Sequence, residues 1–166
     1  MDKIRTGIIG CGGIANQKHF PALKAYSEEC EMVAFCDIIE ERAQKACEQY
    51  GAPGAKYYTD YKEMLKDESI DTVHVLTPNV SHSPITVAAF EAGKNVMCEK
   101  PMAHTTEAAQ AMMEAWKKDW ALQEKIDACK KEGKKIPVEW IKNPFYVKYY
   151  RDRGMLDETG TAGGVK

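Results

Sequence analysis

Near the beginning of the chain stands the stretch Ile4-Arg5-Thr6-Gly7-Ile8-Ile9-Gly10-Cys11-Gly12-Gly13-Ile14-Ala15. Its apolar run predicts a buried strand, its glycines a tight turn, and the residues after them a helix. In that context Gly10, Gly12 and Ala15 fit the G-x-G-x-x-G/A spacing, which lets a backbone approach a pyrophosphate. A helix beginning near Ile14 would attract the anion through its free N–H groups. The stretch therefore predicts a dinucleotide site, although similar glycine-rich turns also serve as ordinary loops.

An acidic residue closes the next predicted strand, residues 31–37. Asp37 lies 22 residues beyond Ala15, near the offset of about 20 at which a carboxylate accepts hydrogen bonds from the adenosine ribose. The alternative is that Asp37 caps the helix expected over 39–50, and one carboxylate could not easily do both. We favour the ribose role because of the upstream glycines. A carboxylate there repels a 2′-phosphate, which favours NAD over NADP, although Arg42 could partly accommodate that phosphate.

Strands and helices alternate through the first hundred residues. We expect strands over 4–9, 31–37, 56–59, 71–76 and 95–98, and helices over 14–26, 39–50, 60–66 and 81–92. Pro21 would kink or split the first helix, and Asp60 is a plausible N-cap. This rhythm predicts an α/β fold of the Rossmann type, a doubly wound parallel sheet. Ligands of such sheets bind beyond the carboxyl ends of the strands. There the glycine turn, Asp37, Thr77–Asn79 and Glu99–Lys100 would meet in one crevice.

Composition excludes several classes of protein. The 166 residues suffice for one domain with a sizeable core, and the net charge of −2 gives no nucleic-acid or membrane-surface footprint. No apolar run approaches the roughly 20 residues of a membrane span, and no secretion signal stands at the start, so we expect a cytoplasmic protein. The six cysteines form no C-x-x-C pair and predict free thiols rather than disulfides or a metal site. Cys11 could have a lowered pKa at a helix N-terminus, but we favour a small residue filling the turn.

Three motifs in order resemble one known family. They are Gly10-Cys11-Gly12-Gly13-Ile14-Ala15, then Thr77-Pro78-Asn79 with His82, then Glu99-Lys100-Pro101. Together they resemble the glucose–fructose oxidoreductase/inositol dehydrogenase/MocA family, closely over residues 3–116 and more loosely over 131–141. The resemblance implies a Rossmann domain that binds NAD or NADP for hydride transfer with a sugar, a cyclitol or a related polyol.

The resemblance also implies roles for individual residues. The turn formed by Gly10, Cys11, Gly12, Gly13 and Ile14 would hold the pyrophosphate, and Asp37 the adenosine ribose. Thr77, Asn79, His82 and Glu99 would line the crevice. Lys100 would lie beside the nicotinamide and assist proton transfer, with Pro101 often cis in relatives. Independently, alcohol oxidation needs a proton acceptor, which a partly desolvated lysine can be. The alternative is a surface lysine paired with Glu99. His19, His74 and His104 receive no role.

The chain departs from the family after its predicted sixth strand, residues 135–141. Relatives continue into a substrate domain that usually supplies a D-x-x-x-H pair, whereas no histidine follows His104 here. We therefore expect a dinucleotide-binding module that is incomplete for catalysis by itself. The alternative is a non-catalytic dinucleotide-binding sensor or a dimerising interaction module.

The last third of the chain carries extra material. We expect one long helix over 105–131, with an addition at 117–132, and a sixth strand over 135–141. The Rossmann domain would thus span residues 1–142, and 143–166 would form an aromatic and basic helix (143–153) with a mobile tail. Aromatic and basic residues alternate in that helix, as in some binders of single-stranded nucleic acid, but packing or a homo-oligomer contact is the favoured role.

Overall fold

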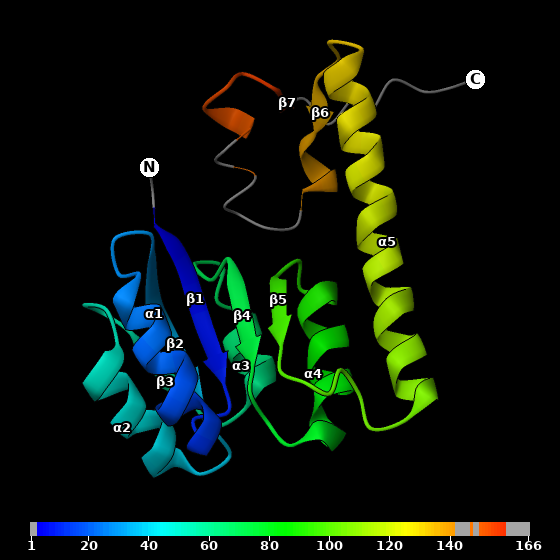
Figure 1. The fold of residues 1–166 in the computed structure, drawn as a ribbon. Helices are drawn as coiled ribbons and strands as arrows, with labels where there is room; N and C mark the ends of the chain where they lie inside the picture. The colour runs from blue at the N-terminus through cyan, green and yellow to red at the C-terminus, as the bar shows by residue number, and fades with distance from the viewer. Residues whose placement is uncertain (1–2, 142–146, 148–149, 159–166) are drawn as a thin grey trace.

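A parallel five-stranded sheet forms the centre of the molecule (Figure 1). The computed structural model describes residues 3–141, 147 and 150–158, without the side chains of residues 119, 120 and 123. The strands pair in the order β3-β2-β1-β4-β5, and every pairing is parallel. Their bounds are β1 Ile4–Ile9, β2 Cys30–Cys36, β3 Lys56–Tyr58, β4 Thr72–Val75 and β5 Asn95–Cys98. This order reverses direction at β1, so it is the doubly wound Rossmann arrangement that the sequence predicts.

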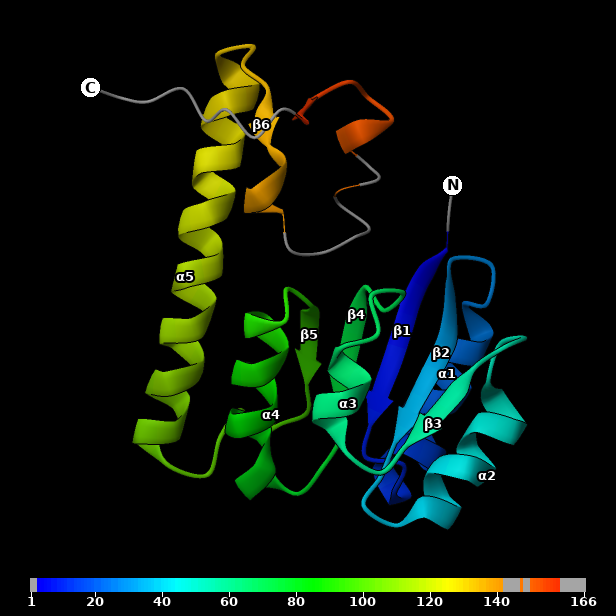
Figure 2. The same cartoon turned by 180° about the vertical axis from the view of Figure 1, so that it is seen from behind.

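Helices cover both faces of the sheet (Figures 1 and 2). Their bounds are η1 Ala15–His19, α1 Phe20–Ala25, α2 Glu40–Tyr50, α3 Tyr61–Leu65, α4 Asn79–Glu91 and α5 Thr106–Lys131. The first predicted helix changes its hydrogen-bond pattern near Pro21: η1 is a π-helical turn, and it runs directly into α1, with Pro21 in the first turn of α1. The predicted cap of α3 is also confirmed, because the Asp60 carboxylate accepts a hydrogen bond from the Lys62 N–H at 2.8 Å.

The core consists of two clusters, one on each face of the sheet. Alternation along β1 divides them, since Ile8 packs with Phe20 and Phe35 on the side of α1 and α2. Ile9 packs with Met64 and Ile85 on the side of α3 and α4. Residues 8 and 9 are both almost fully buried. A strand that is apolar on both faces is typical of a central parallel strand, so the same run that suggested the fold also supplies its core.

The predicted sixth strand is wrong as a member of this sheet. Residues 135–141 instead give a two-residue strand β6 (Ile136–Pro137) and a 3₁₀ turn η2 (Val138–Trp140). β6 pairs in parallel with β7 (Leu156–Asp157), separately from the main sheet. The 26 residues of α5 span about 39 Å at 1.5 Å per residue. The four residues of β5 span only about 13 Å. The unbroken helix therefore carries the chain past the sheet before β6 begins (Figure 1).

A third, small cluster surrounds the far end of α5. Ile126, Ile136, Tyr150 and Leu156 are buried together there. The helix expected over residues 143–153 and the tail expected to follow it lie largely outside the described residues, so the proposed boundary at residue 142 stays a prediction. Across the described part of the chain, no helix is both long and apolar enough to span a bilayer. All six cysteines are free, as predicted.

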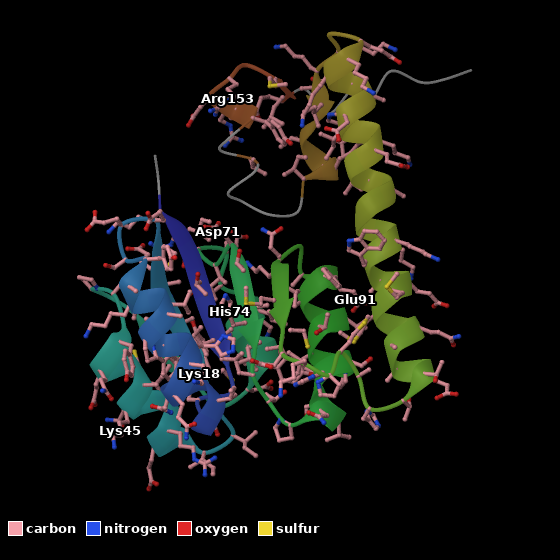
Figure 3. All side chains as sticks on the ribbon, viewed as in Figure 1. Lys18, Lys45, Asp71, His74, Glu91 and Arg153 are labelled. Atoms are coloured by element: carbon pink, nitrogen blue, oxygen red, sulfur yellow. The ribbon has the colours of Figure 1, made fainter. Side chains whose placement is uncertain are left out.

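One buried histidine makes the fold sensitive to acid. His74 on β4 is 6 % exposed, and its Nδ1 has no hydrogen-bond partner within the described residues. Its ring meets that of His19 edge to face, with centroids 5.7 Å apart. Figure 3 labels His74 in the region of the main sheet. Burial, and secondarily the neighbouring His19, lowers the pKa of His74 from 6.5 to about 4.

We therefore expect folding stability to fall as pH drops from about 6.5 to about 4. In that window the unfolded chain binds a proton at His74 that the folded chain excludes, and the difference amounts to roughly 3 kcal/mol. Urea unfolding at pH 7, 5.5 and 4.5 measures it. The variant His74→Leu should lose this part of the pH dependence, whereas His104→Leu, at an exposed position, should keep it. Parallel pH curves for wild type and His74→Leu would contradict the expectation.

Candidate functional site

The glycines of the first turn differ in what surrounds them. Gly10 has φ +98°, and a Cβ there would lie 2.7 Å from the Leu76 carbonyl oxygen, so the fold itself requires glycine. A Cβ on Gly12 or Gly13 would meet no atom within 4 Å. The turn therefore presents open space in front of residues 12 and 13. It is followed directly by a helix, in which the Asn16 N–H donates to the Gly12 carbonyl at 3.1 Å.

Cys11 is a packing residue of this turn. Its side chain is 2 % exposed, and its thiol points to the Cys36 carbonyl at 3.6 Å. Burial, with a contribution from the nearby Asp37 carboxylate, raises the pKa of Cys11 to about 12. A thiol with that pKa is not a nucleophile at neutral pH. The interpretation of Cys11 as a small residue filling the turn is therefore confirmed. Ile14, by contrast, is 39 % exposed beside it.

The Asp37 carboxylate is bonded directly to the glycine turn. Its Oδ2 accepts a hydrogen bond from the Cys11 N–H at 2.9 Å, and its Oδ1 accepts one from the Ile39 N–H at 2.9 Å. The N-cap of α2 is Ile39, which makes no side-chain cap, so the helix-cap alternative for Asp37 is wrong. An ionised carboxylate offers about four lone-pair positions, so each oxygen can accept a further hydrogen bond.

The end of β4 forms the next wall. Thr77 follows the strand, and its buried Oγ1 has no hydrogen-bond partner in the described part of the chain. Asn79 is exposed and begins α4. The backbone of Leu76 and Thr77 also lies so close to Gly10 that a Cβ on residue 10 would clash with it. The glycine turn and the Thr77 turn are thus in direct contact. A buried polar atom without a partner is uncommon in folded proteins and calls for a specific explanation.

The end of β5 carries Glu99, Lys100 and Pro101. The Lys100–Pro101 peptide is cis, and the Lys100 side chain is exposed. The Glu99 carboxylate receives two hydrogen bonds, from the His19 Nε2 at 2.9 Å and from the backbone N–H of Lys100 at 2.8 Å. The bond from His19, more than that from Lys100, lowers the pKa of Glu99. Glu99 is therefore ionised at neutral pH, and its side-chain hydrogen-bond partner is His19.

His82 lies beneath the two turns rather than in the open space. It is 1 % exposed, and its ring nitrogens face two carbonyl oxygens: Nδ1 that of Pro101 and Nε2 that of Thr77, both at 2.8 Å. Both nitrogens are thereby occupied by the protein, and no polar atom of the side chain is left for a ligand. His82 joins the β4 turn to the β5 turn.

A family model described as an oxidoreductase family with an NAD-binding Rossmann fold matches residues 4–137. The chain belongs to this glucose–fructose oxidoreductase/inositol dehydrogenase/MocA family.

Curated and solved members of the family resemble the chain over 70 % to 79 % of its length. The inositol 2-dehydrogenase of Salmonella paratyphi B is 38 % identical over 116 residues, which are 70 % of this chain and 34 % of that protein. KijD10, a 3-ketoreductase from Actinomadura kijaniata solved with NADP, is 30 % identical with a TM-score of 0.64, over 70 % of this chain and 35 % of that one. WlbA dehydrogenase from Bordetella pertussis, solved with NADH, is 26 % identical with a TM-score of 0.66, over 79 % and 40 %. The chain spans about a third of the length of the curated relatives it matches.

His19 is a residue of the site that the sequence analysis did not identify. A weak indication was present, because His19 follows the buried Ala15 by four residues and so shares its inward helix face. Nothing local identified Glu99 as its partner, 80 residues away. Within the described residues, no group of three histidine, cysteine, aspartate or glutamate side chains could hold a metal ion.

Proposed function

We propose that the chain is the cofactor-binding module of an NAD(P)-dependent oxidoreductase and that it prefers NAD. The observation that carries the proposal is the hydrogen bond between the Asp37 carboxylate and the Cys11 N–H. It fixes an acid beside a glycine turn that has open space in front of it. In a Rossmann fold this pair recognises the adenosine ribose and the pyrophosphate of a dinucleotide. The acid also disfavours the 2′-phosphate of NADP.

The other crevice residues fit the same ligand. Gly12, Gly13 and Ile14 would hold the pyrophosphate through their backbone. The unpartnered Thr77 Oγ1 would find its missing hydrogen bond on the dinucleotide, with Asn79 beside it at the start of α4. Glu99 and Lys100 would flank the nicotinamide half, because β5 lies on the opposite side of β1 from Asp37.

When bound, the oxidised dinucleotide supplies the hydride acceptor for oxidation of an alcohol. Lys100 would take the hydroxyl proton on its Nζ, for which it must be unprotonated. Relatives act, by their names, on inositol and glucosides, so we propose a sugar, cyclitol or related polyol as the substrate class. The free thiols support a cytoplasmic location.

Fluorescence titration with NADH and NADPH tests the cofactor site. We expect saturable NADH binding that Asp37→Ala weakens roughly 10- to 100-fold, as expected for lost hydrogen bonds to a charged acceptor. The ratio of NADPH to NADH affinity should rise in the same variant, because the repulsion of the 2′-phosphate is gone. Melting curves control for the bonds that Asp37 makes to the backbone. Absence of binding to either cofactor in the wild-type chain would refute the proposal.

A polyol panel with Lys100→Ala tests the chemistry. If the chain turns over a polyol, the variant should be about 10²- to 10⁴-fold slower, the range for losing a general base. NADH affinity should change far less. Equal rates for the two proteins would remove Lys100 from the mechanism.

The exposure of Lys100 favours a second candidate function, a non-catalytic dinucleotide-binding module. Its side chain is exposed to solvent in this chain, whereas proton transfer by lysine ordinarily depends on burial of the side chain. Saturable NADH binding without turnover of any polyol would support this second function. Turnover that depends on Lys100 would exclude it.

A further inference from the structure

We propose that His19 and His82 are positioning residues that fix the Lys100 turn relative to the two other turns of the crevice. The proposal rests on the proposed function, since it concerns how Lys100 is held beside the nicotinamide half of the dinucleotide. Neither side chain needs to touch the ligand. Each one ties the end of β5 to a different neighbouring turn, and together they would set the geometry of the crevice.

His19 acts from the side of the glycine turn. It lies in η1, the helical segment that begins directly after that turn, and its Nε2 donates to Glu99 Oε1 at 2.9 Å. The other oxygen of the same carboxylate accepts the backbone N–H of Lys100 at 2.8 Å. Both side chains are mostly buried, with 16 % of His19 and 19 % of Glu99 exposed. A charge-assisted pair so shielded from water holds its geometry better than a surface pair.

His74 limits how His19 can move. The two rings meet edge to face at an interplanar angle of 87°, so the His19 ring is held between β4 and the Glu99 carboxylate. The Glu99 backbone is itself fixed, because its N–H donates to the Val75 carbonyl at 3.0 Å. The chain of contacts therefore runs from the helix after the glycine turn, through one carboxylate, to the main chain of Lys100.

His82 acts from the side of the Thr77 turn. It is buried in the first turns of α4 and spans the gap between the Thr77 and Pro101 carbonyl oxygens, at 2.8 Å from each. A carbonyl oxygen only accepts hydrogen bonds, so the ring donates through whichever nitrogen carries a proton, and the other nitrogen stays in contact with the second carbonyl. Pro101 is the residue directly after Lys100. The lysine is thus bracketed, with His19 acting through the residue before it and His82 through the residue after it.

The strand order indicates which half of the ligand would be bound less tightly if these contacts of His19 and His82 were removed. Asp37 lies at the end of β2 and the bracketed lysine at the end of β5, on opposite sides of β1. Adenosine diphosphate ribose has the adenosine and pyrophosphate groups of NADH but no nicotinamide. Displacement of the Lys100 turn should therefore weaken NADH binding and leave adenosine diphosphate ribose binding unchanged.

The test compares His19→Leu, His19→Gln and the control His104→Leu in the full chain. We expect His19→Leu to weaken NADH binding roughly tenfold, the effect of one charge-assisted hydrogen bond, with adenosine diphosphate ribose affinity within about twofold of wild type. In His19→Gln the side-chain amide can still donate to Glu99, so this variant should restore most of the NADH affinity. His104 is exposed, and its replacement should change neither affinity. Equal losses for both ligands, or no rescue by glutamine, would overturn the role of His19.

The backbone amide resonance of Lys100 reports the position of the turn without any ligand. It should shift in His19→Leu and in His82→Leu but not in His104→Leu. Should His82→Leu not fold, His82→Gln replaces it, since glutamine can keep one of the two contacts. An unchanged Lys100 resonance in the folded variants would overturn the proposal. Failure of the wild-type chain to bind NADH is a different result, because it would refute the cofactor site and leave the amide experiment intact.

Discussion

Gly12→Val is expected to weaken NADH binding roughly 100-fold or more, while the fold survives. The reason is that a Cβ at position 12 meets no protein atom within 4 Å. The added isopropyl group would occupy the space that we assign to the pyrophosphate, and it would clash with the ligand rather than with the protein. Titration with NADH and a thermal melt of the same sample separate these two effects.

Two further variants sharpen this test. Gly12→Ala should give a smaller loss of affinity, because one methyl group intrudes less than an isopropyl group. Ala25→Val adds bulk at an exposed position at the end of α1 and should bind NADH like wild type. Normal NADH affinity in Gly12→Val would mean that the ligand does not pass in front of Gly12.

Gly10→Ala should show the opposite behaviour, a large loss of stability. The residue has φ +98°, and its Cβ would approach the Leu76 carbonyl oxygen to 2.7 Å and the Thr77 nitrogen to 3.0 Å. Backbone atoms directly after the central strand β4 cannot yield as a flexible side chain can. Strain at a positive φ and a steric clash cost about 1–3 kcal/mol each, so we expect a loss of about 3 kcal/mol or more in urea unfolding.

Gly54 offers a matched control for the strain alone. Its φ is +82°, but a Cβ there would meet no atom within 4 Å. Gly54→Ala should therefore cost only the backbone strain, about 1 kcal/mol. If the two alanine variants were equally stable, the contact between the glycine turn and the end of β4 would be looser than the distances above imply.

The fold could be predicted because its determinants are local. The apolar strand before Gly10, the turn residues and Asp37 at a fixed offset each express a short-range rule. β6 shows the limit of such rules. Alternation of Ile136, Val138 and Trp140 identified an apolar segment, but strand pairing depends on where the preceding helix ends, and the 26-residue α5 ends beyond the sheet.

The sequence predicted which residues lie at the site better than it predicted the hydrogen bonds that these residues make. Sequence spacing placed Asp37 and the glycine turn at one edge of the sheet, but the hydrogen bond from the Cys11 N–H to the carboxylate is seen only in the folded structure. His82 was expected to line the crevice and is instead buried between two carbonyl oxygens. His19 was overlooked because its partner is remote in the chain. Contacts of this kind depend on how elements dock, which no local pattern encodes.

The separate cluster at the far end of α5 divides the molecule into two units, and the smaller one can unfold without the main sheet. Ile126, Ile136, Tyr150 and Leu156 pack with one another and belong to neither cluster of the main sheet. Local unfolding of this outer unit, the part of the chain held by that cluster, therefore disrupts only the contacts of the cluster. Such local unfolding requires much less free energy than complete unfolding. The strand ends that carry Gly12, Asp37 and Lys100 lie at the other end of the sheet (Figure 1). Local unfolding of the outer unit would therefore leave these strand ends intact. The crevice can stay ordered while the distal part of α5 exchanges its amide hydrogens.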